Sequence, residues 1–573
     1  MEHYKEIYEK WCTDPFFDEE TRAELKSIAG DEAEIQDRFY RRLEFGTGGL
    51  RGVIGAGTNR INRYTVRQAT QGLANYIRSM GGSDRGVAIA FDSRRMSPEF
   101  AEEAALCLNA NGIRTFLFDS LRPTPELSFA VRFLHCMAGI VITASHNPGE
   151  YNGYKVYWED GAQITPPHDR NILAEVAKVT DLSQVRTMPQ EEAKEAGLYR
   201  IIGREIDDAY MERLKEQSIH RDQIGTAAKD IRIVYTPLHG TGNLPVRRVL
   251  KELGFEEVYV VKEQELPDGA FPTVAYPNPE DEKAWTLALA LAKEKDADIV
   301  LATDPDADRL GVYVKDRKTG EYIGFTGNMS GTLMAEYILR EKSLAGTLPP
   351  DAVVVKTIVT TDMVREAALA WGAEIREVLT GFKYIGEQIR LMEEEKDGTY
   401  VFGMEESYGC LAGTYARDKD ACVAVMMLCE AAAFYKRQGK TLWDVMREMY
   451  ETYGWYREGL FTLTRKGMSG AKEIRERMQD LRKNPPESLG GCRVLAVRDY
   501  EAGVRTERST GQTGGTGLPA SDVLYYELEG GAWCCVRPSG TEPKIKYYFG
   551  VKGGSDEEAK ERLNRLKEAL EAL

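Results

Sequence analysis

The sequence has no apolar run long enough to cross a membrane. A membrane-spanning helix needs roughly 18 or more consecutive apolar residues, whereas the longest candidate here, Ala421–Cys429, ends at Glu430 and is typical of a buried helix. The chain starts with Glu2, Lys5 and Glu6 and has no apolar core behind them, so we expect no secretory signal peptide. These absences predict a protein without a membrane partner.

Cysteine patterns that would indicate a zinc site or a disulfide framework are also missing. The nine cysteines form no C-x-x-C pair and no combination with histidine at zinc-site spacing. An odd, scattered set of thiols is typical of a reducing compartment rather than of a disulfide-bonded secreted protein. We therefore expect a cytoplasmic protein with reduced cysteines.

The excess of basic residues that nucleic-acid binding requires is absent as well. The chain has 91 acidic and 75 basic side chains and a net charge of −16. General attraction to DNA or RNA needs a basic face, so we expect no nucleic-acid partner, and no sequence feature indicates an obligate protein partner. An anionic substrate would need a few placed Arg and Lys residues that reverse the field locally.

The remaining composition is that of a globular protein with several domains. The chain has 573 residues, of which 42% are apolar and 29% charged, and about 150 residues per domain predict four domains. The fold class that we expect is α/β, with three similar domains of mixed or parallel sheets followed by a smaller C-terminal α+β domain. We place these domains at residues 1–208, 209–325, 326–455 and 456–573.

Short β-branched runs alternate with helical patterns in three successive stretches, which favours α/β sheets. The strands are expected near Val87–Phe91, Thr115–Phe118 and Ile140–Thr143, then Ile231–Tyr235, Val258–Val261 and Ile299–Ala302, then Ala352–Lys356, Glu374–Val378 and Thr399–Phe402. The last domain has expected strands near Arg493–Val497, Val523–Leu528, Trp533–Val536 and Ile545–Phe549.

A polar loop ends each of the three α/β stretches. These loops are Thr143–Pro148, Asp304–Arg309 and Gly403–Ser407, and each directly follows an apolar strand. Ligands of open α/β sheets gather beyond the carboxyl ends of the strands. We therefore expect the three loops to form walls of one central cleft.

The second loop carries three carboxylates at alternate positions. Asp304, Asp306 and Asp308 would point to one side of an extended backbone, and three such groups repel unless a cation lies among them. Hard oxygen ligands suit Mg²⁺. An EF-hand is excluded, because Arg309 stands at the sixth position instead of Gly and Lys315 at the twelfth instead of Glu. A solvated acidic turn is the alternative; the preceding buried strand favours the metal site.

The first loop offers a candidate nucleophile, Ser145, with His146 beside it and Lys155 downstream. A serine hydroxyl needs a base, a metal or an electrostatic clamp to become a nucleophile. The alternative is a hydroxyl-rich turn that caps a helix. A hydrolase triad is a poor fit, since the chain has no G-x-S-x-G motif.

The C-terminal domain contains a candidate phosphate clamp at Arg537, Ser539, Gly540 and Thr541. The guanidinium can hold two oxygens, the hydroxyls can donate, and Gly540 lets the backbone approach closely. A simple Pro-Gly turn is the alternative. The glycine-rich segment that contains Arg51 matches neither G-x-G-x-x-G nor a P-loop, so nothing indicates nucleotide binding.

Taken together, these loops resemble those of the α-D-phosphohexomutases, and most closely the phosphoglucomutase branch. The resemblance extends from about Trp11 to Phe549, and its four loops follow in the family's order: phosphoserine, metal, sugar and phosphate loops. It implies four domains around a central cleft, with Ser145 carrying a phosphoryl group.

The resemblance also implies a role for each matching residue. Mg²⁺ would be bound by the three aspartates of the metal loop and an oxygen of phosphorylated Ser145. Arg51 and Arg309 would steady the transferring group, Lys155 would be the general acid or base, and His146 would line the site. The residues that contact the sugar would be Thr380, Gly381, Glu405, Ser407 and Lys419, and the distal phosphate would bind at Arg537, Ser539, Gly540 and Thr541.

The implied activity is the interconversion of α-D-glucose 1-phosphate and glucose 6-phosphate through a glucose 1,6-bisphosphate intermediate. A phosphomannomutase or a phosphopentomutase would use the same mechanism. A sugar phosphatase that uses the same phosphoserine, and a sugar-phosphate sensor without turnover, are further alternatives. An intact serine loop and metal loop argue against the sensor, and the Glu405–Ser407 pair favours a mutase, since a hydrolase need not hold both ends of its substrate.

Overall fold

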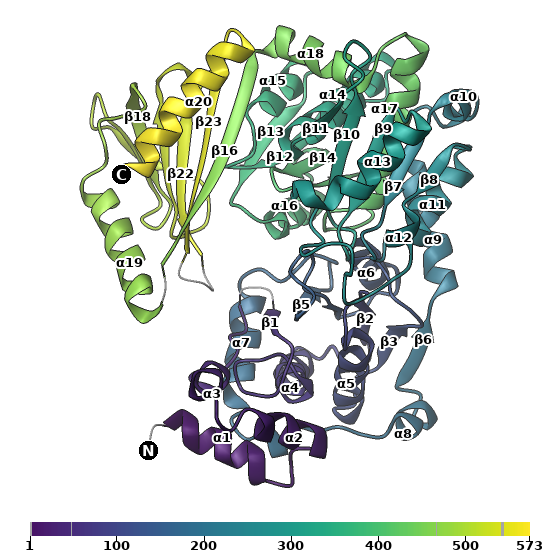
Figure 1. The fold of residues 1–573 in the computed structure, drawn as a ribbon, viewed down its shortest axis with the longest axis vertical. Helices are drawn as coiled ribbons and strands as arrows, with labels where there is room; N and C mark the ends of the chain where they lie inside the picture. The colour runs from purple at the N-terminus through teal and green to yellow at the C-terminus, as the bar shows by residue number, and fades with distance from the viewer. Residues whose placement is uncertain (1–2, 47–48, 466, 540–543) are drawn as a thin grey trace. The chain divides into compact units, whose positions relative to one another are not determined.

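The computed structural model describes residues 3–46, 49–465, 467–539 and 544–573 (Figure 1). Its internal contacts divide the chain into two compact units. The first unit comprises Met1–Ser330 and Phe382–Leu442, and the second comprises Gly331–Gly381 and Trp443–Leu573. Across the described ranges, no helix combines the length and the apolar character needed to pass through a bilayer.

The first unit begins with a six-stranded mixed sheet whose order is β1-β5-β4-β2-β3-β6. Strands β4, β2, β3 and β6 run parallel, and β5 is antiparallel to both of its neighbours. The strand bounds are β1 Gly49–Val53, β2 Val87–Phe91, β3 Thr115–Phe118, β4 Ala138–Ile142, β5 Tyr151–Trp158 and β6 Tyr199–Ile202.

Helices cover both faces of this sheet. Successive side chains of a strand point to opposite sides, and every residue of β2, β3 and β4 is buried, so both faces need cover. Ile89 of β2 lies in the apolar core completed by α4 (Arg63–Ser79) and α5 (Ser97–Ala110). On the other face, a Cβ on Gly139 would touch side chains of α6 (Thr124–Phe133). Burial of one large aliphatic side chain stabilises the fold by roughly 1.5–3 kcal/mol, and both faces are densely apolar.

A second mixed sheet, of order β11-β10-β9-β7-β8, follows in the same unit. Strands β7, β8 and β9 are parallel, and β10 is antiparallel to β9 and β11. One face packs on α13, and the helix α17 contacts β9 and β10. The bounds are β7 Ile233–Thr236, β8 Val258–Val260, β9 Ile299–Thr303, β10 Leu310–Lys315, β11 Tyr322–Phe325, α13 Thr286–Lys295 and α17 Ala421–Arg437.

Helix α17 is the buried helix that the apolar run Ala421–Cys429 predicts, and nearly all of its side chains are buried. Its first turn is capped by Asp420, whose carboxylate accepts hydrogen bonds from the backbone N–H groups of Cys422 and Val423. Helix α6 starts instead with Pro125 in its first turn, where a missing N–H costs nothing. Both helix starts therefore have defined positions, and both contact the metal loop, as described below.

The third group of strands contributes an antiparallel hairpin to the first unit, β14 (Thr399–Glu405) with β15 (Gly409–Ala412). Helix α16 (Phe382–Glu395) packs on β14. In the second unit, β12 (Ala352–Thr357) and β13 (Glu374–Val378) form a parallel pair.

The C-terminal part of the second unit contains an antiparallel sheet whose main path is β16-β23-β22-β21-β18-β19-β20. Helix α20 packs on β16 and β23 (Figure 1), and α19 contributes to the same core. The bounds are β16 Trp455–Thr464, β17 Ser488–Leu489, β18 Cys492–Asp499, β19 Val504–Glu507, β20 Thr513–Gly515, β21 Leu524–Leu528, β22 Trp533–Pro538, β23 Lys544–Gly553, α19 Gly467–Lys483 and α20 Asp556–Glu571.

The other helices surround these sheets. They are α1 His3–Thr13, α2 Glu19–Ser27, α3 Glu32–Phe39, α7 His168–Lys178, α8 Gln190–Glu195, α9 Arg204–Glu216, α10 Arg221–Ala227, α11 Asn243–Glu252, α12 Lys262–Glu265, α14 Gly327–Leu344, α15 Met363–Ala370 and α18 Leu442–Tyr453, with short 3-10 turns at Leu182–Gln184, Ala228–Asp230, Glu282–Trp285 and Glu529–Gly531.

The α/β fold class predicted from the sequence is confirmed, and the sheets are mixed. In each of the three α/β stretches, a strand that the sequence did not indicate, β5, β10 or β15, runs antiparallel directly after the predicted polar loop. The three loops therefore occupy equivalent positions, each between a predicted strand and its antiparallel partner. The four domain boundaries stay a prediction.

Candidate active site

Ser145 lies in the loop between β4 and β5, with a left-handed backbone (φ 51°). Its N–H donates to Thr143 Oγ1 at 2.8 Å, which fixes the turn. Its side-chain hydroxyl donates to Asp304 Oδ2 at 2.7 Å, and His146 Nδ1 lies 3.1 Å from the same oxygen. Although Ser145 is only 3% exposed, its hydroxyl faces the carboxylate loop and not the hydrophobic interior.

The backbone of the carboxylate loop differs from the prediction. The predicted extended conformation from Asp304 to Asp308 is wrong, because the segment turns, with Ala307 in the left-handed region (φ 51°). Asp304 Oδ1 accepts hydrogen bonds from the N–H groups of Asp308 at 3.2 Å and Arg309 at 3.0 Å, so one aspartate caps the turn. The turn, and not strand alternation, brings the carboxylates together.

The three carboxylates fit a divalent cation. Asp304, Asp306 and Asp308 are all buried, and each offers an oxygen within 4.8 Å of the others. Among the described residues, Asp306 Oδ1 and Asp308 Oδ1 have no hydrogen-bond partner although they are buried. An unpartnered buried carboxylate oxygen is costly, and a cation bound by oxygen ligands would satisfy both atoms.

Burial and neighbouring charges shift the pKa values of the carboxylates in the site. Burial, and next to it the charges of Asp306 and Asp308, raise the pKa of Asp304 well above its usual value. Burial alone would also raise the pKa of Asp306, but the Lys155 ammonium, together with hydrogen bonds from Asp304 and Thr124, lowers that pKa. The neighbouring charges therefore move the pKa values of these two carboxylates in opposite directions.

Two lysines already face the carboxylates. Lys155 Nζ lies 2.8 Å from Asp306 Oδ2 and 3.5 Å from Asp308 Oδ2. Lys419 Nζ lies 3.2 Å from Asp308 Oδ2 and 4.0 Å from Glu405 Oε1. The ammonium groups of Lys155 from β5 and Lys419 from the segment before α17 thus converge on the loop, as the sequence predicts for residues of one site.

The sugar-loop residues lie beside Lys419. Ser407 donates its hydroxyl hydrogen bond to Glu405 Oε1 at 2.9 Å, and Glu405 is buried at the end of β14. Burial raises the pKa of Glu405. A side chain on Gly409 would overlap Lys419, because its Cβ would lie 2.0 Å from Cδ of that lysine. Strand β14 continues through Glu405, so only the part of the predicted loop Gly403–Ser407 that follows Glu405 lies outside the strand.

The remaining residues predicted in the first unit surround the serine. Arg309 lies 2.7 Å from Glu280 Oε1, and its Nε lies 3.9 Å from Asp308 Oδ1. Arg51 donates to Asn147 Oδ1 in the serine loop at 3.2 Å. Burial, with Arg309 and Arg51 close by, lowers the pKa of His146 well below its usual value. The structure therefore brings eleven predicted site residues into one unit, Arg51, Ser145, His146, Lys155, Asp304, Asp306, Asp308, Arg309, Glu405, Ser407 and Lys419.

Six predicted substrate contacts lie in the second unit or outside the described residues. Thr380 and Gly381 follow β13, and within the described part of the chain the buried Thr380 Oγ1 has no hydrogen-bond partner. Arg537 belongs to β22, and the Ser539 N–H donates to Lys544 O at 2.7 Å. Gly540 and Thr541 lie outside the described residues. The roles of all these residues stay predictions.

The strand that leads to Thr380 is fixed by ion pairs. Glu377 of β13 lies 3.3 Å from Lys356 Nζ and 2.6 Å from Arg365 Nη2, and 3.2 Å from Arg498 Nη1. Burial would raise the pKa of Glu377, but these three cations lower it to about 2. This strand end is therefore held by a carboxylate that is ionised at neutral pH.

The residues that support the metal loop from behind were not predicted from the sequence. Thr124, the first residue of α6, donates its hydroxyl to Asp306 Oδ2 at 2.9 Å and its N–H to Asp306 O at 2.9 Å. The N–H of Ala421, at the start of α17, donates to Ala307 O at 3.1 Å. No local pattern marks such partners, because they come from distant parts of the chain.

A glycine closes the back of the same loop, and its replacement gives a prediction. A Cβ on Gly240 would lie 2.5 Å from Cα of Pro305, a backbone atom that can move only with the loop. We expect Gly240→Ala to displace the aspartates and to weaken metal binding roughly tenfold or more, measured as the Mg²⁺ concentration that gives half-maximal activity.

Gly30→Ala is the matched control, because a Cβ there meets nothing within 4 Å. It should leave the Mg²⁺ requirement unchanged. An unchanged requirement in Gly240→Ala as well would show that the loop does not depend on this close contact.

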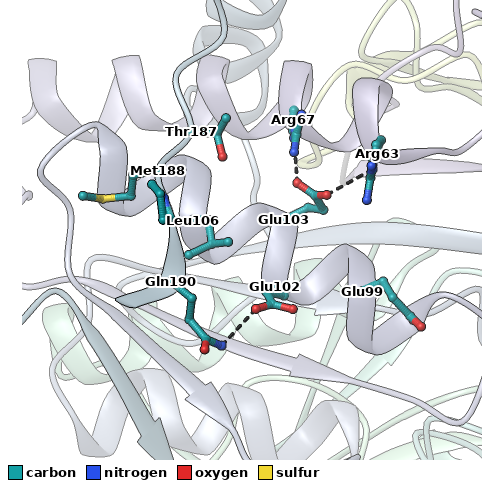
Figure 2. Close-up of a pocket in the computed structure, with 10 residues that line it drawn as sticks. Arg63, Arg67, Glu99, Glu102, Glu103, Leu106, Thr187, Met188 and Gln190 are labelled. Atoms are coloured by element: carbon teal, nitrogen blue, oxygen red, sulfur yellow. Dashed lines mark hydrogen bonds and ion pairs between the residues drawn. The ribbon is translucent and has the colours of Figure 1, made fainter. Parts of the chain in front are cut away.

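A depression of the first unit, about 550 Å³ in volume, lies between α4, α5 and the segment before α8 (Figure 2). Its two arginines are already paired: Arg63 and Arg67 lie 3.1 and 2.6 Å from the carboxylate of Glu103. Gln190 donates to Glu102 at 2.9 Å. Because both arginines are paired with Glu103, and Arg63 also with Asp18, we assign no phosphate group to this depression.

Three models of one known protein family match most of this chain. Residues 42–183, 208–320 and 326–453 match the models of phosphoglucomutase/phosphomannomutase α/β/α domains I, II and III. The chain therefore belongs to the phosphoglucomutase/phosphomannomutase family, a family of phosphohexomutases, and the resemblance inferred from the four loops is confirmed.

Several similar curated proteins within this family are phosphoglucomutases. The phosphoglucomutase of Staphylococcus epidermidis is 36% identical over 519 residues, which cover 90% of this chain and 92% of the relative. The phosphoglucomutase of Staphylococcus aureus is 35% identical over 545 residues, covering 95% and 96%.

Solved structures share the fold at lower identity. A phosphoglucomutase/phosphomannomutase family protein of Burkholderia thailandensis has a TM-score of 0.64 and 21% identity and covers 91% of this chain and 96% of its own. The Paramecium phosphoprotein pp63/parafusin in its open form has a TM-score of 0.65 and 16% identity, with 93% and 94% covered.

Proposed function

We propose that this protein is a phosphoglucomutase that interconverts α-D-glucose 1-phosphate and glucose 6-phosphate through a phosphoserine at Ser145. The observation that carries the proposal is the 2.7 Å contact between the Ser145 hydroxyl and Asp304, one of three buried carboxylates that fit a cation. A phosphoryl group on that oxygen would lie beside the cation site. The curated relatives carry the same activity in their names.

The cation in this proposal is Mg²⁺, held by Asp304, Asp306, Asp308 and one oxygen of phosphorylated Ser145. Bound there, Mg²⁺ would supply charge stabilisation for the transferring phosphoryl group. Oxygen ligands and two unpartnered carboxylate oxygens support this assignment.

The phosphoryl group would move first from Ser145 Oγ to the 6-hydroxyl of glucose 1-phosphate. The P–Oγ bond breaks, a bond to the sugar oxygen forms, and the hydroxyl proton passes to a group of the site. Lys155 and His146 are the groups that we assign to proton transfer. Arg51 and Arg309 would neutralise charge on the transferring group.

The resulting glucose 1,6-bisphosphate would then reverse its orientation and return its 1-phosphate to Ser145. This step requires that the sugar and the distal phosphate be held in either orientation. We assign the sugar to Thr380, Gly381, Glu405, Ser407 and Lys419, and the distal phosphate to Arg537, Ser539, Gly540 and Thr541.

The free thiols of all nine cysteines support a cytoplasmic location for the enzyme.

A substrate panel tests this proposal. We expect kcat/KM to be highest for glucose 1-phosphate, lower for mannose 1-phosphate and ribose 1-phosphate, and to depend on Mg²⁺ in every case. Inorganic phosphate should remain a small fraction of the product, because the Glu405 carboxylate and the Ser407 hydroxyl can hold sugar hydroxyls, whereas a hydrolase need not hold both ends of its substrate.

Two results would contradict the assignment. Release of one phosphate for each glucose 1-phosphate consumed would identify a phosphatase. A higher kcat/KM for ribose or mannose 1-phosphate would retain the mechanism and replace the substrate.

A further inference from the structure

The serine loop is built around the side chain of one buried arginine, Arg94, which follows β2. Its Nη2 donates to the carbonyl oxygen of Ser145 at 2.5 Å and to that of Asn147. Its Nη1 donates to the carbonyl oxygens of Pro148 at 2.7 Å and Tyr151 at 3.0 Å. A single guanidinium thus binds four carbonyls of one short segment.

The guanidinium is in turn held by Asp92. Arg94 Nε lies 3.3 Å from Asp92 Oδ2, and both side chains are fully buried. Asp92 Oδ2 also accepts a hydrogen bond from Thr143 Oγ1 at 2.6 Å, and this hydroxyl accepts the one from the Ser145 N–H. Asp92 and Arg94 therefore fix the serine from both of its neighbouring peptide groups.

A residue of the second α/β stretch covers the same guanidinium. The ring of Phe271 lies 5.0 Å from the Arg94 guanidinium carbon and is 2% exposed. Gly269, two residues earlier, approaches the backbone so closely that its Cβ would lie 2.5 Å from Arg95 N. The stretch that carries the aspartates thus packs directly on the support of the serine loop.

This arrangement suits a guanidinium and no other side chain. Five N–H donors in a rigid plane can reach several carbonyls and one carboxylate at once, whereas a lysine ammonium has three donors around one point. Among the described residues, the polar partners of the Arg94 guanidinium are backbone carbonyls of the loop and Asp92, and the Ser145 hydroxyl is not one of them. Its contacts instead hold Ser145 in its left-handed conformation, with the hydroxyl toward Asp304.

We propose that Arg94 is a positioning residue for phosphoryl transfer, because it holds the 145–151 backbone in the geometry that places Ser145 Oγ beside the aspartates. The inference rests on the proposed role of Ser145 as phosphate carrier. Since transfer rates depend steeply on the placement of the reacting oxygen, loss of the guanidinium should slow the transfer step while substrate binding is retained.

The test is Arg94→Lys, which keeps the positive charge and removes the planar set of donors. We expect kcat for glucose 1-phosphate to fall roughly 10- to 100-fold with KM changed less than about threefold. In a single turnover, phosphoryl transfer from glucose 1,6-bisphosphate to dephosphorylated enzyme should slow by the same factor. Arg60→Lys is the matched control, since Arg60 is also buried and binds carboxylates and a carbonyl.

A folded Arg94→Lys enzyme with the kcat of the wild type would overturn the proposal. If that variant does not fold, Asp92→Asn replaces it: the amide keeps the shape and removes the counter-charge of Arg94. We expect a roughly tenfold lower kcat with unchanged KM, and an unchanged kcat would again overturn the proposal. Mapping the phosphate on wild-type enzyme separates the two hypotheses, because a phosphate absent from Ser145 would refute the proposed function itself.

Discussion

Replacement of Ser145 by Ala is expected to lower the conversion of glucose 1-phosphate by about 10⁴-fold or more. The variant keeps the carboxylates and the lysines but has no oxygen that can carry the phosphoryl group. Among the described residues, the hydrogen-bond partners of the Ser145 hydroxyl are Asp304 and His146, both of the site itself, so its loss should leave the fold intact. The coupled assay for glucose 6-phosphate, at saturating Mg²⁺ and glucose 1,6-bisphosphate, measures the effect.

The control for this variant is Ser27→Ala, which removes an exposed hydroxyl that bonds only to a carbonyl of its own helix. Its activity should equal that of the wild type. Substantial turnover by Ser145→Ala would eliminate the phosphoserine mechanism, whatever the metal dependence of that turnover.

Replacement of Asp306 by Asn is expected to lower kcat/KM by roughly 10²–10³-fold. The change removes one negative charge from the cation site and one of its unpartnered oxygens, and it also weakens the 2.8 Å ion pair with Lys155. Removal of divalent cations with a chelator should abolish the activity of the wild type, and added Mg²⁺ should restore it.

Thermal unfolding gives a second measurement for the same variant. A ligand that binds only the folded state raises the melting temperature, so Mg²⁺ should stabilise the wild type and have little effect on Asp306→Asn. Asp230→Asn, at an exposed position of the same α/β stretch, is the control and should respond to Mg²⁺ like the wild type. Equal stabilisation of the wild type and Asp306→Asn would place the cation elsewhere.

The positions of the three candidate loops were predictable because each follows a short, strongly apolar strand. Strand β9, for example, is a buried run that stops at Asp304, and the strand before Ser145 is equally apolar. In each sheet the loop follows the carboxyl end of a strand, where ligands of α/β sheets gather, so each loop could be predicted as part of a site. The three strands belong to different sheets, and their loops are brought together by contacts that the sequence does not show, such as the one between Ser145 and Asp304. The chemistry of each loop could then be inferred from its own residues.

The shape of the metal loop was not predictable from the same pattern. The spacing of its carboxylates indicated an extended segment, whereas the structure has a turn at Ala307 with a left-handed backbone. Glycine or asparagine usually marks such a turn, and alanine gives no such signal. The hydrogen bonds that Asp304 accepts from the following N–H groups stabilise the turn instead.

The supporting residues were missed for a different reason. Thr124 contacts Asp306 across 182 positions of the sequence, and such a contact leaves no local pattern. Arg94 was closer to detection, because Asp92 and Arg94 follow the buried strand β2 in the same way as the catalytic residues follow theirs. The three loops were selected because polar residues directly follow a buried strand. The same criterion, applied to β2, would have selected Asp92 and Arg94 as candidate site residues.

The most direct measurement of the central claim is the location of the phosphate after wild-type enzyme is incubated with glucose 1,6-bisphosphate and Mg²⁺. Peptide mapping by mass spectrometry should find one phosphoryl group, on Ser145, and addition of glucose 1-phosphate should remove it and yield the bisphosphate. A phosphoryl group on any other side chain, or none that glucose 1-phosphate can accept, would contradict the account.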